Sequence, residues 1–360
     1  MVFTGEIMES LQSQYYHIAY SDLWNHFYNL CKQCDVEFKF GFDVVEAQAG
    51  KVDLDPVTIS SSSGEEVICD IVVGADGNHS TIRKLVEERE RLVLGEESDV
   101  EGSSESKPSL APWIRISLPV ARMQTDPGLA ELSREDWWNI WMFNGVAYNC
   151  GKEGPDQYVL NIFCDHPRYA NLQETDWSEE TTSEVPELLK RVAEPQLQKI
   201  IELASSFQVT KQASRVLHRY TDKCNQVVII GAAAHACMIN GTFNSAIAIE
   251  DAFTLGYLFS RMSARNEIPY LLHGLGEIRQ RHTEIVKASD SDVLHLLCMP
   301  PGPEQEARDA LFKQTHREDS ENEETLEFMW SSYITQFDYD AKEAVEEWWL
   351  NWMKPIENSR

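Results

Sequence analysis

The sequence predicts a mixed α/β protein that combines a short parallel sheet, an antiparallel sheet and a group of C-terminal helices. Two apolar runs, residues 67–74 and 226–231, each end in a glycine turn before a helical segment, which is typical of parallel strands. Between them lie four short apolar runs separated by Gly and Pro, which predict antiparallel strands. An acidic pattern with helical periodicity from Leu271 onward predicts the helices.

The composition is that of a folded and strongly acidic protein. The 360 residues include 31 Lys and Arg against 59 Asp and Glu, which gives a net charge of −28, and 42% of the residues are hydrophobic. This hydrophobic content excludes wholesale disorder, and the length predicts about two domains. The negative charge argues against nucleic acid and against an anionic membrane as partners.

Nothing in the sequence indicates export or a membrane anchor. No apolar run reaches the roughly 18–20 residues of a membrane span, and the residues after Met1 lack the basic and apolar regions of a signal peptide. The eight cysteines are scattered, and the pair Cys31 and Cys34 has no second pair at zinc-ligand spacing. We therefore expect a cytoplasmic protein with reduced thiols and no metal site.

The N-terminal part of the chain predicts two helices and three strands. A capped pattern predicts a helix over Ser21–Cys31, and apolar alternation predicts strands over Val36–Phe40 and Val57–Ser61. The apolar run Val67–Gly74 predicts a buried strand that ends at a tight turn, and a helix over Ser80–Glu90 follows it. An acidic stretch rich in Ser and Gly then predicts a surface linker.

The middle of the chain predicts a sheet and then helices. Turn residues separate the expected strands Trp113–Pro119, Trp138–Phe143, Val146–Cys150 and Tyr158–Cys164. Helices are expected over Glu184–Ala193, Glu194–Ser205 and Ser245–Met262. The expected domains are a discontinuous one at residues 1–107 and 208–300, a β-sheet domain at 108–207 and an acidic, Trp-rich helical region at 301–360.

Two motifs at the strand ends carry a family resemblance. The first motif is Gly74-Ala-Asp-Gly77, followed by Ser80 and Arg83. The second is Gly231-Ala-Ala-Ala-His235, followed by Gly241 and by Ile249-Glu-Asp-Ala252. In order and spacing they resemble the motifs of FAD-dependent aromatic hydroxylases, the salicylate-hydroxylase-like flavin monooxygenases. C-terminal stretches at 302–309 and 337–341 resemble those of fungal members, so the resemblance covers nearly the whole chain.

The resemblance implies a fold, cofactors and a substrate class. The parallel strands would be the remnant of a Rossmann-like FAD-binding sheet, and the antiparallel sheet would cover the substrate. FAD and NAD(P)H would be the cofactors, and the substrate would be an aromatic or polyketide-type small molecule of secondary metabolism. The residues that the resemblance places at FAD are Asp76, Gly77, Arg83, Gly231 and Gly241.

His235 and Arg115 are the candidate catalytic residues. A histidine beside the ligand could act as an acid or a base, whereas a histidine at a turn is more often only hydrogen-bonded. An arginine in an apolar, aromatic strand is typical of a clamp for a carboxylate or a phenolate. Two of the FAD-site residues have alternative roles, because Asp76 could cap a helix and Arg83 could pair with surface carboxylates.

Several positions depart from the family pattern. The chain has no GxGxxG unit, which in the family binds the FAD pyrophosphate, so we expect a βαβ segment to be absent. Tyr20 stands where the family has an Arg, Ala232 replaces the Asp that bonds the ribityl chain, and Asn244 replaces a Gly near the flavin ring. Ile239 and Ala246 also differ from the family residues. These changes predict that FAD binds weakly or not at all.

Three functions remain open at this point. The first is the family activity, FAD-dependent hydroxylation, by a chain that is part of a longer one. The second is a cofactor-free cyclase, isomerase or hydrolase on the same scaffold, with acid, base or clamp roles for His235, Arg115, Asp165 and Tyr220. The third is a non-catalytic, decayed paralogue. Loss of the βαβ segment would expose a sheet edge, which predicts association with another chain, such as a second copy, unless the N-terminal residues cover that edge.

Overall fold

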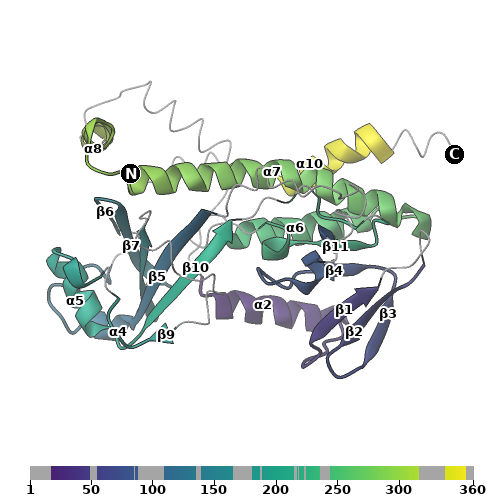
Figure 1. Cartoon of the computed structure of the whole chain (residues 1–360), viewed down its shortest axis with the longest axis horizontal. Helices are drawn as coiled ribbons and strands as arrows, with labels where there is room; N and C mark the ends of the chain where they lie inside the picture. Colours follow the sequence, from purple (N-terminus) through teal and green to yellow (C-terminus); the bar gives the residue numbers. More distant parts are fainter. Residues whose placement is uncertain are drawn as a thin grey trace, which may run out of the picture. The chain divides into compact units, whose positions relative to one another are not determined.

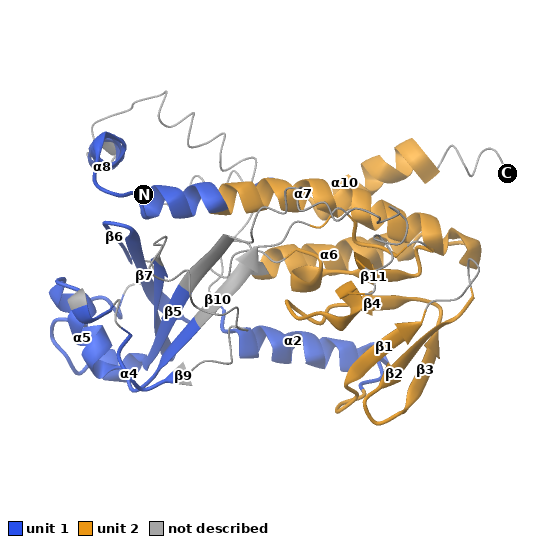
Figure 2. Ribbon diagram, in the orientation of Figure 1, with its two compact units in different colours: residues 1–38, 110–212, 291–338 blue, residues 39–109, 213–290, 339–360 orange. Residues whose placement is uncertain are grey.

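The structure is a computed structural model of the whole chain, and it divides the chain into two compact units (Figure 2). Unit 1 comprises residues 1–38, 110–212 and 291–338, and unit 2 comprises residues 39–109, 213–290 and 339–360. The residues that the structure describes are 18–48, 55–84, 86–87, 109–134, 139–164, 181–186, 189–214, 217, 219–222, 224–235, 244–315 and 337–353. Within these residues, no helix combines the length and the apolar character needed to cross a membrane.

Unit 2 contains two small sheets (Figure 1). The first is antiparallel and consists of β1 (Val44–Gln48), β2 (Val57–Ser61) and β3 (Glu66–Cys69), in that order. The second is a parallel pair, β4 (Val72–Gly74) and β11 (Val227–Ile229), in which Val73 lies opposite Val228. The predicted strand at Val57–Ser61 is confirmed, and both predicted parallel strands contribute to the parallel pair.

Two strand predictions in the N-terminal region are wrong. Residues 36–40 are irregular, because the backbone turns at Asp35 (φ +57°) and at Gly41 (φ +73°), and Phe38 packs edge-on against Tyr28. The three apolar side chains that alternate there, Val36, Phe38 and Phe40, are all exposed. The expected single strand Val67–Gly74 is two strands, since β3 pairs with β2 while β4 leaves that sheet to pair with β11.

The helices of unit 2 follow the predicted pattern. Residues 81–84 and 86–87 are helical, as expected after the first glycine turn. The long helices are α6 (Asn244–Phe259) and α7 (Ile268–Leu297), of which residues up to 290 belong to unit 2. Shorter elements are the 3₁₀ turns η3 (Gly231–Ala233) and η4 (Arg265–Glu267), the helix α10 (Ala341–Trp348) and the π-type turn η5 (Trp349–Met353).

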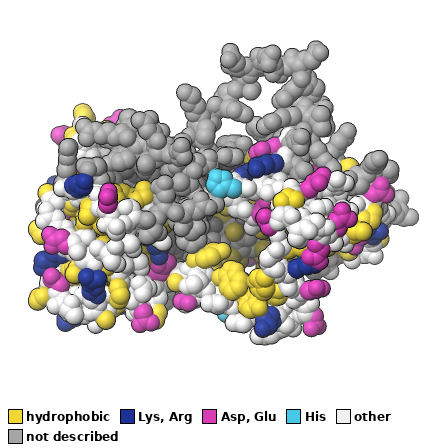
Figure 3. Space-filling view, turned by 60° about the horizontal axis from the view of Figure 1, so that its bottom comes forward, with side chains coloured by type: hydrophobic (Ala, Val, Ile, Leu, Met, Phe, Trp, Pro, Cys, Tyr) yellow, Lys and Arg dark blue, Asp and Glu magenta, His cyan; other side chains and the backbone are white. Residues whose placement is uncertain are grey.

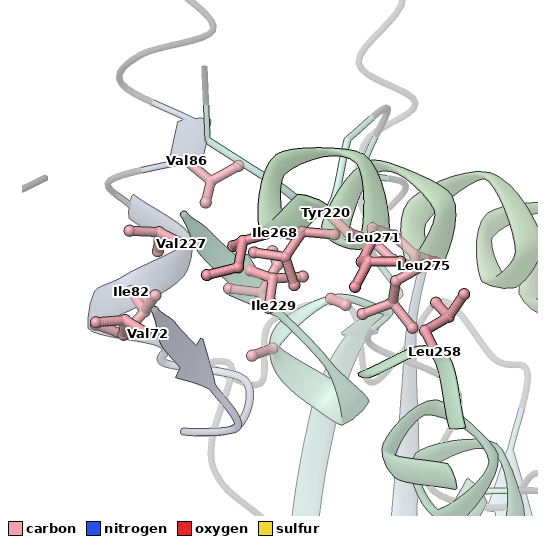
Figure 4. Packing of buried hydrophobic residues seen from close by; sticks show 14 of the residues in the cluster. Val72, Ile82, Val86, Tyr220, Val227, Ile229, Leu258, Ile268, Leu271 and Leu275 are labelled. Atoms are coloured by element: carbon pink, nitrogen blue, oxygen red, sulfur yellow. The ribbon is translucent and has the colours of Figure 1, made fainter. Parts of the chain in front are cut away.

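The core of unit 2 lies between the parallel pair and the helices (Figure 4). Val72 of β4 and Ile229 of β11 pack in one buried cluster with Ile82, and Leu271 and Leu275 of α7 belong to the same cluster. Such burial contributes about 1.5–3 kcal/mol for each large aliphatic side chain. The core therefore fixes the strand ends at which both glycine turns begin.

Unit 1 is built on a six-stranded sheet in the order β6-β7-β8-β5-β10-β9 (Figure 1). The strands are β5 (Ser109–Pro119), β6 (Asn139–Phe143), β7 (Val146–Glu153), β8 (Gln157–Cys164), β9 (Thr181–Thr182) and β10 (Phe207–Ser214). Its helices are α2 (Tyr20–Gln33), α4 (Val120–Met123), α5 (Pro195–Leu203), α8 (Pro303–Thr315) and the 3₁₀ turn η2 (Leu189–Arg191). The predicted antiparallel sheet is confirmed, and its core contains Ile116, Leu160 and Leu197.

The predicted helix Glu184–Ala193 is wrong, while the helix that follows it is confirmed as α5. Among the described residues of this range, 184–186 and 189–193, the helical ones are the single turn η2, and Leu189 donates its backbone N–H to the carbonyl of Pro186 across 2.9 Å. Pro186, inside the predicted range, disfavours the helical conformation of Val185 before it, and Pro195 does the same for Glu194. Glu194 is accordingly extended (φ −73°, ψ 120°) and caps α5 through its side chain.

Helix α2 keeps its apolar side chains on the surface. The helix forms where it was predicted, but none of its residues is buried. Its exposed apolar side chains, at helical spacing, are Tyr20, Trp24, Phe27 and Leu30. Figure 3 shows exposed apolar side chains gathered on the face that this view brings forward. A helix with such a stripe is typical of an interaction surface.

Gly74 allows close packing of β4 against the helix that follows it. A Cβ atom at this position would lie 2.6 Å from Cβ of Ile82 and 3.1 Å from Cγ2 of Ile229. We predict that Gly74→Ala lowers the free energy of unfolding by about 1–3 kcal/mol, because core overpacking forces backbone shifts. Urea denaturation measures this change.

Gly256→Ala is the matched control for Gly74→Ala. Gly256 lies inside α6, and a Cβ atom there would meet nothing within 4 Å. This variant is expected to leave the free energy of unfolding unchanged or to raise it by up to about 1 kcal/mol, because Ala favours a helix over Gly. Equal effects of the two substitutions would contradict the packing argument.

Candidate functional site

The two sequence motifs meet at the carboxyl ends of the parallel pair. Gly74 lies opposite Ile229 in register, and the backbone N–H of Ile230 donates to the carbonyl of Gly74 across 2.9 Å. Each strand then runs directly into its glycine turn. In open α/β sheets this edge is the place where ligands bind.

The first turn is closed by the side chain of Asp76. Its Oδ2 accepts the backbone N–H groups of Thr81 (2.8 Å) and Ile82 (3.2 Å), and its Oδ1 accepts the hydroxyl of Ser80. The carboxylate thus caps the helix, which is the alternative role that the sequence offered. Gly77 has φ +79°, a conformation that L side chains rarely adopt, and a Cβ atom there would meet nothing within 4 Å.

Arg83 connects the first turn to the second. It is only 2% exposed, and its Nη1 donates to the carbonyl of Ala233 across 3.2 Å. Its Nε lies 3.9 Å from Oε1 of Glu87, a long ion pair. The buried guanidinium therefore contacts the second turn and also the carboxylate of Glu87.

The second turn is held by a buried carboxylate. Gly231 has φ +59°, and its backbone N–H donates to Oδ2 of Asp251 across 2.8 Å. His235 is 3% exposed, and its Nε2 lies 2.5 Å from the same oxygen. One carboxylate oxygen therefore fixes both ends of the turn, and this nitrogen of His235 is occupied by Asp251.

Arg279 completes this network from α7. Its Nε donates to Oδ1 of Asp251 and its Nη2 donates to Oε2 of Glu250, both across 2.7 Å. The guanidinium is fully buried, and its neighbouring carboxylates keep its pKa raised although burial acts in the other direction. Burial would raise the pKa of Asp251, but its contacts with His235 and Arg279 outweigh burial and hold this pKa below the usual value.

Asp251 belongs to the second sequence motif, but neither Asp251 nor Arg279 was predicted as a site residue. Asp251 follows Glu250 in a helix that is otherwise mostly apolar, and two adjacent acids in such a helix are a usable signal for a buried ion pair. Arg279 lies in a charged stretch of α7, and such a stretch predicts a helix face exposed to solvent. Only the packing of α7 against α6 brings its guanidinium to Asp251.

Of the remaining predicted residues, Tyr220 lies beside the second turn, with its ring centroid 6.2 Å from that of His235. Arg115 lies on β5 in unit 1, where its Nη2 forms an ion pair with Oε2 of Glu153. Tyr220 is buried in unit 2, and its hydroxyl lies 2.7 Å from Oγ1 of Thr283. Gly241 and Asp165 lie outside the described residues.

The described residues fit a flat group that lies against the backbone of the two turns. Both turns are in left-handed conformations at a glycine, and the outer side of Gly77 faces open space. Two buried side chains, Arg83 and Asp251, hold the turns in place from behind. Ala232 offers only a methyl group, so the hydrogen bond that the family Asp makes to a ribityl chain has no equivalent at this position.

We predict that Asp251→Asn strongly destabilises unit 2. The variant keeps the size of the side chain but removes one of the two carboxylates that pair with the buried Arg279 guanidinium, and breaking a buried ion pair costs about 3–5 kcal/mol. Urea denaturation at pH 7 measures this loss. Because the pKa of Asp251 is lowered in the folded protein, its stabilisation is present above the unfolded pKa of about 3.9 and is lost as the pH falls below it.

Asp70→Asn is the matched control for Asp251→Asn. Asp70 forms an ion pair with Arg265 in which both side chains are more than half exposed. Its removal is expected to change the free energy of unfolding by less than about 1 kcal/mol at pH 7. If Asp251→Asn is no more destabilising than this control, the buried network does not hold the second turn.

Comparison with known proteins agrees with this geometry. Residues 8–282 match the family model described as "FAD binding domain". The chain is 24% identical over 284 residues to the FAD-dependent monooxygenase atnJ of an Arthrinium species, which covers 78% of this chain and 62% of that protein. It is also 24% identical to the hispidin-3-hydroxylase of Neonothopanus nambi, over 66% of this chain and 56% of that protein. The chain thus spans about three fifths of the length of these curated relatives.

Solved structures show the same fold. A salicylate hydroxylase in complex with its substrate superposes with a TM-score of 0.64 at 16% identity, covering 90% of this chain and 74% of that one. CtdE in complex with FAD and a substrate gives a TM-score of 0.65 at 12% identity, covering 92% of this chain and 74% of that one. With the family model matching most of its length, the chain belongs to the FAD binding domain family and has the fold of the salicylate-hydroxylase-like flavin monooxygenases.

Proposed function

We propose that this chain belongs to an FAD- and NAD(P)H-dependent monooxygenase that hydroxylates an aromatic small molecule. The observation that carries the proposal is the pair of glycine turns at the ends of β4 and β11, tied together by Arg83. Family membership supports FAD as the cofactor, and relatives named as monooxygenases and hydroxylases support the reaction. The aromatic substrate is supported by the salicylate hydroxylase fold.

The residues of the two turns have positioning roles in this proposal. When bound, FAD supplies the redox and oxygen chemistry, and the protein supplies orientation and exclusion of water. The backbone at Gly77 and Gly231 would hold the cofactor, together with Gly241 further along the second motif. Asp76 and Arg83 hold the turns, one as a helix cap and the other by its bond to Ala233.

His235 acts through its place in the second turn. Its Nε2 is bound to Asp251 and its ring is buried, so it fixes the path of the chain beside the cofactor. Arg115 belongs to the sheet that, by the family fold, covers the substrate. Its ion pair with Glu153 makes it a positioning residue on that sheet.

The proposal is tested by the visible spectrum of the purified protein during titration with FAD. Binding shifts the visible absorption band of FAD and sharpens its shoulders relative to free FAD, and NAD(P)H should bleach this band faster when an aromatic substrate is present. We expect binding that is weak, because Ala232 and Asn244 replace the family residues. A folded protein that binds no FAD at saturating concentration would rule the proposal out.

Ala232→Asp restores the family residue in the second turn. We predict that this variant binds FAD about tenfold more tightly, because a hydrogen bond to a charged group contributes about 1.5–3 kcal/mol. Fluorescence quenching of FAD measures the dissociation constants of both proteins. Ala232→Leu, which adds similar bulk without a polar atom, should bind FAD no better than the parent chain, and equal tightening by both variants would contradict the assigned role.

A further inference from the structure

One face of the six-stranded sheet carries a row of polar side chains. In the register of the sheet, Arg115 of β5 lies opposite Asn161 of β8, which lies opposite Asn149 of β7. We call these three residues the amide row. Their neighbours on the strands, Ile116 and Leu160, point to the other face and form the core of unit 1. The amide row therefore lies on the face opposite that core.

The amide row contains buried polar atoms without partners. Among the described residues, Oδ1 of Asn149 and Oδ1 of Asn161 have no hydrogen-bond partner, and neither has Nε1 of Trp113 on the same face. Asn161 is 9% exposed and Trp113 is 6% exposed. Buried polar atoms are nearly always paired in native proteins, and an exception calls for an explanation such as a ligand.

The charge of the amide row is already balanced. The guanidinium of Arg115 forms an ion pair with Glu153, and both side chains are largely buried. A carboxylate ligand would therefore have to compete with Glu153 for the same cation. The groups that still need partners are two neutral oxygen acceptors and one indole N–H donor.

We propose that the amide row, with Trp113, selects a neutral aromatic substrate that carries hydroxyl groups and a carbonyl oxygen, and does not select an aromatic carboxylate. The hydroxyl groups donate to the two amide oxygens, and the carbonyl oxygen accepts from Nε1 of Trp113. The rings of Trp113 and Phe163, which lie opposite each other on this face, contact the flat part of the ligand. This inference rests on the proposed function, since it names the substrate class of the same reaction.

The test is isothermal titration calorimetry of the full chain with three small aromatic probes. The first probe, 2,4-dihydroxyacetophenone, has both hydroxyls and the carbonyl. The second, 2,4-dimethoxyacetophenone, lacks the hydroxyl donors, and the third, 2,4-dihydroxybenzoate, carries a carboxylate. We expect the first probe to bind at least tenfold more tightly than either of the others, because they leave acceptors unpaired or bring a competing charge.

Asn161→Leu should remove this preference. The substitution keeps a side chain of similar size without polar atoms, so we expect binding of the dihydroxy ketone to weaken at least tenfold and binding of the dimethoxy ketone to stay unchanged. Asn149→Leu is the second variant, in case the first does not fold. Asn139→Leu is the matched control, because Asn139 lies opposite Cys150 and so faces the core side of the same sheet.

The outcomes separate this inference from the proposed function. The inference is wrong, and the flavin proposal stands, if the parent chain binds FAD but binds the carboxylate probe more tightly than the dihydroxy ketone or does not bind the dihydroxy ketone. The same conclusion follows if Asn161→Leu weakens binding of both ketones equally. In the opposite case the parent chain binds the dihydroxy ketone but no FAD, and binding of this ketone is weakened by Asn161→Leu and not by Asn139→Leu. The inference then holds while the proposed function fails.

Discussion

The geometry of the candidate site depends on one buried carboxylate. Asp251 accepts the backbone N–H of Gly231, contacts Nε2 of His235 and forms an ion pair with Arg279. Gly231 and His235 are the two ends of the second glycine turn and Arg279 belongs to α7, so the carboxylate joins this turn to α6 and α7. In a low-dielectric interior such hydrogen-bonded ion pairs hold their members in place, and removing one member leaves the others buried without a partner.

The parallel pair and its two turns could be predicted because their signals are local. An apolar run that ends in Gly74-Ala-Asp-Gly77 specifies a strand, a tight turn and a helix cap within a few residues. The same locality explains the failure at residues 36–40, where alternation without a pairing partner produced no strand. A local pattern can indicate a strand, but the strand forms only where the chain supplies a partner to pair with.

The interior contacts of the site could not be predicted in the same way. Asp251 and Arg279 lie on separate helices, and no periodicity states which helix faces will meet. The amide row has a similar origin, because Asn149 and Asn161 are adjacent only in the register of the β7–β8 hairpin. The role of Arg115 as an anion clamp was predicted from its residue type and its apolar strand. Its ion pair with Glu153 could not be predicted, because the two residues lie on different strands.

The order of segments along the chain has a consequence for how the protein folds. β4 pairs with β11, and almost the entire sheet of unit 1 lies between these two strands in the sequence. During synthesis β4 must therefore wait for its partner while the intervening segment leaves the ribosome and forms its own hairpins, which are rich in local contacts. In that interval the unpaired β4 and the apolar residues around it can pair with the wrong segment. The slow step of folding is expected to be the pairing of β4 with β11, because it closes the long loop between them.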